Sequence, residues 1–442
     1  MAALCWYLLG YAFTYGGSLD SALRNKFIGN YVFALYRIRE GNHNSTSYGY
    51  AWFLQQFFYA LVCNSIVASA LGGRTSTVAH VMSTIYTVSF LFPVIAHFVW
   101  STDGWLSAIK PAQESEIGTI GAIDMAGSGV VHLLGGSISL AASLFLRKRD
   151  APKAASEDAT SLTLGAFLKL FAMYSYVTGA SVIINPETAM IMNQADPVSG
   201  PISNYTTTNV WGVHTDSNDR MYMTVGRGAV CLTLSVAASS LTVLFLESLV
   251  SNEVNLTHAV NALTIGFAAI SSNIYTCEPW AALIAGFVAG LLYIGGRRGL
   301  KSLKDNDTFV IHGLGGIWGL LFTGFLAKPK FIRDAIGGYW WPQRFATPSP
   351  PPPFPPPPSP PPPPLLGRRL LAVTAAQVAP RHSGVFYPHG GPNGKLLGAM
   401  LLEIAIVICW GFVMALPLFG VLSAMKKLTE KAGDKYTEKT DA

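Results

Sequence analysis

Two ionisable side chains stand in a segment that is otherwise almost entirely apolar. The stretch GAIDMAGSGVVHLLGGS, residues 121–137, contains Asp124 and, further on, His132. An ionised group at bilayer depth costs about 2.5 to 3.5 kcal/mol on insertion scales, so it normally faces a partner or a water-filled path. A neutral imidazole costs less, and it can both donate and accept a hydrogen bond. One helix with a peripheral acid and a central imidazole therefore indicates a polar path through the membrane.

A second histidine has similar surroundings. In DTFVIHGLGGIWGLLFTGFLA, residues 307–327, His312 is followed by several glycines. Small residues allow helix backbones to approach closely in a membrane, so His132 and His312 suggest a shared site. The plainer alternative is two unrelated core histidines, each hydrogen-bonded to a backbone carbonyl. For Asp124 the plainer alternative is a helix cap or an interhelical hydrogen bond.

Composition defines the elements that must position these side chains. The chain has 442 residues, of which 50% are hydrophobic and 12% charged, whereas soluble domains have about 25% charged residues. Crossing the hydrocarbon takes about 20 residues as a helix, and no segment shows the alternating polarity of a membrane strand. We therefore expect an all-α, polytopic transmembrane bundle with about ten spans. They lie near residues 1–17, 50–72, 78–100, 122–146, 162–184, 225–250, 258–276, 278–296, 308–328 and 395–424.

Other chemistries have little support in the sequence. The five cysteines lie in or beside apolar runs, at spacings that form no metal or redox motif, and are expected to be small buried hydrophobes. No phosphate-binding glycine loop, nucleophile elbow or paired catalytic carboxylates is found. The net charge of +6 is accounted for by basic loops beside the spans. We expect no enzyme, no cofactor, no metal site and no nucleic-acid partner.

One connection is almost pure proline. Residues 348–364, PSPPPPFPPPPSPPPPP, cannot form a helix or a sheet, because proline lacks an amide donor and fixes φ. An extended polyproline II spacer is expected, with attachment to extracellular matrix as the functional alternative. The sequons at Asn44 and Asn204 fall on the predicted outer side, which makes the chain a candidate glycoprotein.

Six motifs resemble those of one protein family. AIDMAGSGVVH (122–132) resembles the fifth-helix signature of the Amt/Mep/Rh ammonium transporters, and HGLGGIWG (312–319) resembles the tenth-helix signature. The further matches are WSTDGW (100–105), NALTIGFAAI (261–270), CEPWAALIAG (277–286) and NGKLLGA (393–399). They follow the family's order over nearly the whole chain and are most similar to plant and algal members.

The resemblance implies a multi-pass transporter of the plasma membrane, with inverted repeats, that forms a homotrimer in the lipid bilayer with a pore in each subunit. It would recruit ammonium, or methylammonium as an analogue, deprotonate it and pass ammonia with or without a relayed proton. His132 and His312 match the twin histidines of that pore. Trp105 matches the tryptophan of the outer recruitment site, with Trp100 the alternative if the alignment is shifted, and Asp124 matches an acid near that site.

Several positions depart from the family pattern. Tyr59 and Tyr176 occupy the gate positions where the family usually has two stacked phenylalanines. Lys169, Glu247 and Glu403 lie inside predicted spans, and a snorkelling side chain is the plain explanation for the lysine. The first span matches the family's second helix, so the first helix has no counterpart. The altered gate and this difference support an alternative function, a non-conducting ammonium sensor or regulatory subunit of a transporter trimer.

The spans and connections divide the chain into four parts. A transmembrane core, without the family's first helix, is expected over residues 1–328 and an extracellular loop, containing the insertion 348–364, over 329–394. A final span over 395–424 and a cytoplasmic tail over 425–442 follow.

The orientation of the spans follows from Lys and Arg, which concentrate in cytoplasmic loops. The basic stretches RKRDAPK (147–153), GRRGLKSLK (296–304) and MKKLTEK (425–431) fall on one side if ten spans alternate. Both ends of the chain are therefore predicted to be cytoplasmic.

Reporter tags in intact cells test this topology. Tags at both ends should be protected from external reagents, whereas a protease site placed within residues 348–364 should be cleaved from outside. An N-terminal tag that reacts from outside, or a protected proline-rich segment, would contradict the assignment.

Overall fold

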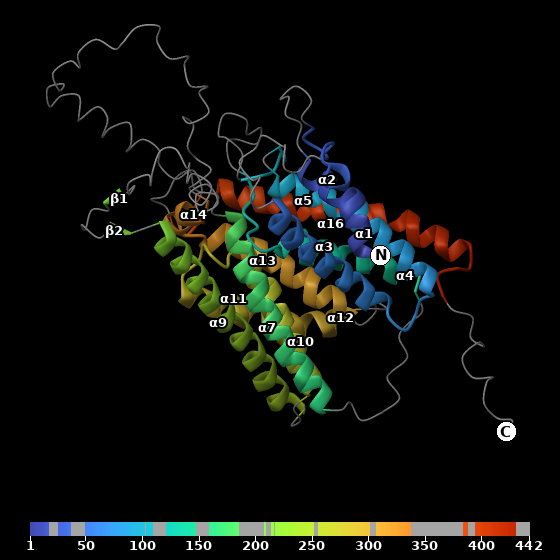
Figure 1. The fold of residues 1–442 in the computed structure, drawn as a ribbon. Coiled ribbons are helices and arrows are strands. Elements are labelled where there is room, and N and C mark those ends of the chain that lie inside the picture. Colours follow the sequence, from blue (N-terminus) through green and yellow to red (C-terminus); the bar gives the residue numbers. More distant parts are fainter. Residues whose placement is uncertain are drawn as a thin grey trace, which may run out of the picture.

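The structure is a computed structural model in which most of the described chain is helical (Figure 1). It describes residues 1–16, 25–36, 49–101, 103–108, 121–146, 159–184, 207–208, 214–215, 217–251, 255–300, 306–336, 383–387 and 394–429. The proline-rich segment 348–364, the sequons at Asn44 and Asn204 and the end of the tail lie outside these residues. What the sequence predicts for them stays a prediction.

A helix occurs at each of the ten predicted apolar runs. In chain order these are α1 (Ala2–Cys5), η1 (Trp6–Gly10) and α2 (Tyr11–Tyr15); α3 (Gly49–Leu71); α4 (Thr77–Tyr86), η4 (Thr87–Leu91) and α5 (Phe92–Trp100); η5 (Ser128–Leu133) and α6 (Leu134–Ser143); α7 (Ala159–Ile184); α9 (Ser217–Ser251); α10 (Leu256–Ser271); α11 (Pro279–Gly299); α12 (Asn306–Thr308), η6 (Phe309–Leu314) and α13 (Gly315–Leu326); and α16 (Lys395–Ala424). The shorter elements are η3 (Phe33–Leu35), α14 (Pro329–Ile336) and the antiparallel strands β1 (Thr207–Thr208) and β2 (His214–Thr215). The prediction of a helical chain is confirmed.

Six helices within the described residues are long and apolar enough to cross a membrane. They are Trp52–Leu71, Thr77–Trp100, Met223–Val250, Pro279–Gly299, Phe309–Leu326 and Lys395–Ala424. The shorter apolar helices are Ser128–Ser143 and Leu256–Ser271. Large apolar side chains, such as Phe171 of α7 and Phe245 of α9, are exposed on the outside of the bundle. Extended apolar surfaces of this kind mark contacts with a membrane or another protein.

Local sequence signals explain where several helices begin. Ser76 precedes α4, and its Oγ accepts the Ala79 amide at 3.2 Å. Asn255 caps α10 in the same way through the His258 amide, also at 3.2 Å. Such side chains satisfy amides that have no acceptor within the helix.

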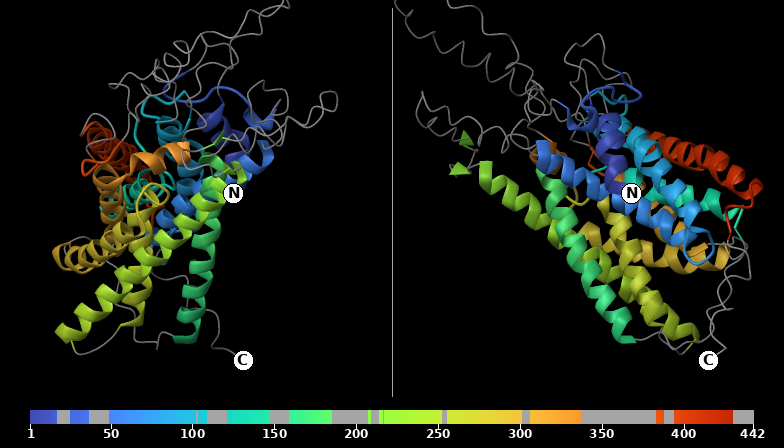
Figure 2. Two further views of the ribbon diagram at one scale, coloured as in Figure 1. Left: turned by 90° about the vertical axis from the view of Figure 1, so that its left-hand side faces the viewer. Right: turned by 45° about the vertical axis from the view of Figure 1, so that its right-hand side comes forward.

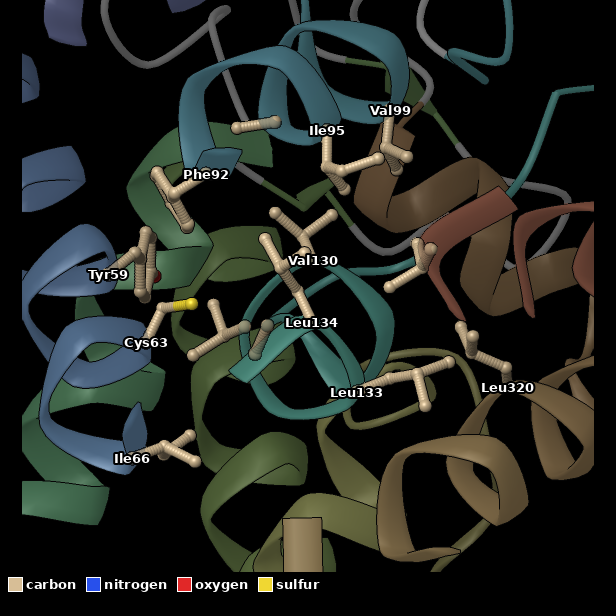
Figure 3. Close-up of a cluster of buried hydrophobic side chains, with 14 of the residues drawn as sticks. Tyr59, Cys63, Ile66, Phe92, Ile95, Val99, Val130, Leu133, Leu134 and Leu320 are labelled. Atoms are coloured by element: carbon tan, nitrogen blue, oxygen red, sulfur yellow. The ribbon is translucent and has the colours of Figure 1, made fainter. Parts of the chain in front are cut away.

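The helix formed by η5 and α6 lies inside the bundle, with α3, α5, α10, α13 and α16 packed against its two parts. Figure 3 shows this packing: Tyr59 and Cys63 of α3 and Phe92 of α5 surround Val130 and Leu134. On one side of the bundle α7 and α9 run next to each other, as the views in Figures 1 and 2 agree. Because its surroundings are protein, this helix can carry polar side chains that a lipid-facing helix could not.

The helix that carries His132 begins later than the predicted span 122–146. Residues 121–127 form a non-helical connection, and the helix starts at Ser128. Asp124 therefore lies before the helix, and the expectation that a continuous helical path joins it to His132 is wrong. The reason is local: Gly127 has a left-handed backbone with φ +85°, which glycine adopts at no steric cost, and the chain turns there.

Candidate functional site

His132 and His312 meet side by side although 180 positions separate them in the chain. Their Nδ1 atoms lie 2.9 Å apart, and the ring planes are within 4° of parallel. One Nδ1 must donate and the other accept, so neutral rings share a single proton at this contact. His132 Nε2 is buried and has no hydrogen-bond partner within the described residues. The pair thus keeps one ring nitrogen open for a small polar molecule.

His97 shows how an ordinary core histidine is held in the same bundle. Its two ring nitrogens contact the backbone carbonyls of Thr14, at 2.7 Å, and Asn25, at 2.8 Å. In His132 and His312 the ring nitrogens contact each other instead. The two settings differ in kind, because a carbonyl can only accept a hydrogen bond, whereas an imidazole nitrogen can either donate or accept one.

Both histidines of the pair lie in π-helical turns, His132 in η5 and His312 in η6. Such wide turns are rare and occur frequently at functional sites. The two helices cross closely beside the pair, since a Cβ added to Gly136 would lie 2.7 Å from the Gly313 amide nitrogen. Glycine at this crossing permits the backbone approach that brings the two rings into contact.

A row of aromatic rings leads to the histidine pair. The Tyr59 ring lies 5.3 Å from the Trp100 ring and 4.4 Å from the Tyr176 ring, measured between centroids. Phe267 continues the row at 5.4 Å from Tyr176 and 5.3 Å from His132. All five side chains are buried. The contacts range from tilted to edge-on, as aromatic pairs prefer.

The tyrosine hydroxyls at the predicted gate both have backbone partners. Tyr176 donates to the Ala126 carbonyl at 2.9 Å, and Tyr59 donates to the Tyr176 carbonyl at a long 3.4 Å. Buried phenol groups need such partners, whereas phenylalanines would not. The first of these bonds ties the gate ring to the connection that precedes the His132 helix.

The buried Asp124 carboxylate holds the start of that helix. Oδ1 accepts the Ser128 amide at 2.8 Å, and Oδ2 accepts the Gly129 and Val130 amides, each at 2.9 Å. These first amides have no acceptor within the helix, and a helix start favours negative charge. The Asp124 backbone carbonyl also accepts the Trp100 indole N–H at 2.6 Å. The structure therefore shows Asp124 as a cap that also anchors an aromatic ring.

Hydroxyl groups connect this turn to two further helices. Ser128 Oγ donates to the Ala268 carbonyl and accepts the Ser272 amide, both at 2.7 Å. Ser272 Oγ in turn donates to the Ile123 carbonyl and accepts Thr323 Oγ1, again at 2.7 Å. The start of η5, the end of α10 and helix α13, which continues from the His312 turn, are thereby joined into one rigid unit.

The two candidate tryptophans have different surroundings. Trp105 is half-buried, and its ring contact is with Phe98 at 5.6 Å. Trp100 is buried and touches Tyr59. Among the described rings it is therefore Trp100, and not Trp105, that adjoins the tyrosine pair. The motif WSTDGW contains both residues, so a signature alone could not choose between them.

Glu403 is a site residue for which sequence reasoning found no role. It lies on α16, is fully buried and stands next to the Asp124 carboxyl. A Cβ on Gly129 would be 2.3 Å from its Oε1, so it faces the same helix start. Neither Oε atom has a hydrogen bond of good geometry within the described residues. Two adjacent carboxyls in a dry site are costly to ionise together, and the three amides favour the charge on Asp124.

Glu247, another acid inside a predicted span, belongs to a separate polar cluster. Glu247 contacts His258, which contacts Arg297, and Arg297 Nε lies 3.0 Å from Asp307 Oδ1. This cluster joins the C-terminal ends of α9 and α11 to the starts of α10 and α12. All five cysteines are free. Within the described residues no group of three or more His, Cys, Asp or Glu side chains could hold a metal ion.

These helices and their buried polar site define a multi-pass helical membrane protein. The model of the Ammonium Transporter Family matches residues 1–440, and the chain belongs to that family. It is 31% identical over 437 residues to the Arabidopsis thaliana protein named "Putative ammonium transporter 1 member 5", covering 96% of this chain and 72% of that one. It is also 31% identical over 447 residues to ammonium transporter 1 member 1 of the same plant, covering 98% and 73%.

Solved structures share the fold at lower sequence identity. The crystal structure of Saccharomyces cerevisiae Mep2 superposes with a TM-score of 0.68 at 19% identity, over 98% of this chain and 78% of that one. A structure named "Sensor Amt Protein" superposes with a TM-score of 0.65 at 18% identity, over 97% and 83%. These likenesses confirm the predicted fold class, an all-α bundle of the ammonium transporter type with about ten spans.

Replacing Glu403 tests its link to Asp124. Glu403→Gln keeps the size and one hydrogen-bond donor, so thermal unfolding of the purified protein in detergent should change little. Glu403→Ala removes the donor and opens a cavity, which should cost about 2 to 4 kcal/mol. Leu401→Ala, at an exposed position of the same helix, is the control. Equal destabilisation by Gln and Ala would contradict a role for a hydrogen-bond donor at position 403.

Proposed function

We propose that this protein transports ammonium across the plasma membrane, passing ammonia along the histidine pair. The observation that carries the proposal is the 2.9 Å contact between the two Nδ1 atoms, with His132 Nε2 left buried and unpaired among the described residues. A shared proton leaves each ring able to offer a donor or an acceptor to ammonia. Ordinary core packing does not need this arrangement, as His97 illustrates.

Recruitment of ammonium is assigned to the end of the row that begins at Trp100. An ammonium ion over an aromatic face gains about 0.5 to 2 kcal/mol, most where water is excluded. Trp100 supports this role better than Trp105, because its ring adjoins Tyr59 and its indole N–H is held by the Asp124 carbonyl. The Asp124 carboxylate adds a negative charge nearby, although three amides occupy its oxygens. Its contribution is therefore electrostatic and structural.

Deprotonation follows from the loss of water at the gate. Burial favours the neutral form of any base, so ammonium that moves past Tyr59 and Tyr176 should release its proton and continue as ammonia. Ammonia then meets imidazoles that can bind it through a single hydrogen bond. Either ring nitrogen can carry a proton, so a relay of that proton along the pair is also chemically possible.

The proposal also includes assembly of the protein into a homotrimer and its glycosylation. Exposed apolar side chains on α7 and α9 supply surfaces for lipid and for neighbouring subunits, which supports a homotrimer in the bilayer. Glycosylation at Asn44 or Asn204 rests on their sequons alone. Transport is preferred to the sensor alternative because no described feature distinguishes a sensor, and the structure named for a sensor shares only the fold at 18% identity.

The histidine pair should act as one unit in transport. His132→Ala or His312→Ala leaves the partner ring without its hydrogen bond in a dry site, which costs about 1 to 3 kcal/mol. If the transport barrier rises by that amount, uptake should fall by roughly 5- to 150-fold. The double change should add little, because both variants remove the same contact. Uptake of labelled methylammonium and the evoked current would be measured in a transport-deficient cell, normalised to surface protein.

His80→Ala, at a half-exposed position of α4, provides the control for a histidine outside the pair. Unchanged uptake and current in both single variants would exclude the paired mechanism. Additive losses would indicate two separate structural histidines. A wild-type protein that assembles at the surface but neither takes up label nor carries current would favour the non-conducting sensor.

The two tryptophans can be separated by substrate affinity. Trp100→Leu should raise the half-saturating methylammonium concentration by roughly 2- to 30-fold, the cation–π contribution expressed as an affinity. Trp105→Leu, the matched variant, should change it by less than about twofold. A larger effect at Trp105 would restore that residue to the recruitment site.

A further inference from the structure

Lys169 is a positively charged side chain held within the bundle. It lies on α7, and its ammonium group donates to Thr264 Oγ1 at 3.1 Å. Thr264 is buried in the interior of α10, about 12 Å along the axis from the first residue of that helix. A snorkelling lysine would extend to the water at the membrane surface. This one instead turns between two helices, so the plain explanation offered by the sequence does not describe it.

The Lys169 ammonium lies beside the histidine pair. Its partner Thr264 precedes Phe267 by three positions, so the two share one face of α10. Phe267 touches both the Tyr176 and the His132 rings. Lys169 precedes the gate residue Tyr176 by about two turns of α7, and its partner Thr264 precedes Phe267 by about one turn of α10.

No carboxylate forms an ion pair with Lys169 in the described part of the chain, where its recorded partner is the neutral Thr264 hydroxyl. The acids in this part of the bundle have other partners: Asp124 binds backbone amides, and Glu247 binds His258. Glu403 faces Asp124 and the start of the His132 helix. The field of the lysine therefore acts on the histidine pair with little local compensation.

We propose that Lys169 selects against charge on the transport path: its fixed positive charge beside His132 and His312 excludes a second cation, so the species that passes is neutral ammonia. This inference rests on the proposed transport function and makes it specific. Two unit charges about 10 Å apart, at an effective dielectric of about 20, repel each other. This repulsion corresponds to roughly a 15-fold preference for the neutral species over a cation. The proton released by ammonium outside stays outside, and ammonia takes up another proton after crossing.

The number of charges moved per transported molecule tests the proposal. In voltage-clamped oocytes, labelled methylammonium uptake and the evoked current would be recorded from the same cells. The wild-type protein should move about a tenth of a charge or less per methylammonium. Lys169→Met and Lys169→Gln should raise that ratio by roughly tenfold, toward one charge, because the repulsion is lost. Lys169→Arg should keep it low.

Lys330→Met, at an exposed position of α14, is the matched control that removes one positive charge elsewhere. A ratio near one charge in the wild type, or an unchanged ratio in transporting Met and Gln variants, would overturn the inference while leaving transport intact. Failure of both neutral variants to assemble would make Lys169 structural and also overturn it. Wild-type protein at the surface with no uptake and no current would instead overturn the proposed function, and this inference with it.

Discussion

The organisation of the site depends on one carboxylate that accepts three backbone amides. A helix that starts inside a membrane protein exposes amides that neither water nor lipid can satisfy, and the Asp124 side chain takes those of Ser128, Gly129 and Val130. The same residue holds Trp100 through its carbonyl. A cap, a helix start and an aromatic ring are thereby fixed relative to one another, and His132 follows one turn later.

Close backbone contact transmits this geometry to the second histidine. Gly136 meets Gly313 where the helices cross, and the hydroxyls of Ser128, Ser272 and Thr323 bond across the neighbouring helix ends. Packing and hydrogen bonds must hold helices together in lipid, since there is no hydrophobic driving force between them. The small residues of both signatures therefore serve position rather than chemistry. On our proposal, the chemistry comes from the two imidazoles, whose Nδ1 atoms this framework brings to 2.9 Å.

Buried charges of opposite sign occupy different places along the row of rings. Asp124 lies at the helix start next to Trp100, with Glu403 beside it, whereas Lys169 lies beyond Phe267. On our proposals, a cation is attracted where the row begins and repelled where it ends at the histidines. Burial makes this separation effective, because the interactions of such groups are screened far less than those of surface charges.

The sequence alone determined the elements and the chemistry: apolar runs predicted the ten helices, since hydropathy is a local property, and the motifs singled out His132, His312, Tyr59 and Tyr176. Only the tertiary structure decided the partners. It showed that Asp124 caps a helix that starts at Ser128, that Trp100 rather than Trp105 adjoins Tyr59, and that Glu403 faces Asp124. The last two facts join residues far apart in the chain, as do the histidines at 180 positions. No local pattern encodes a contact whose two halves lie on different helices.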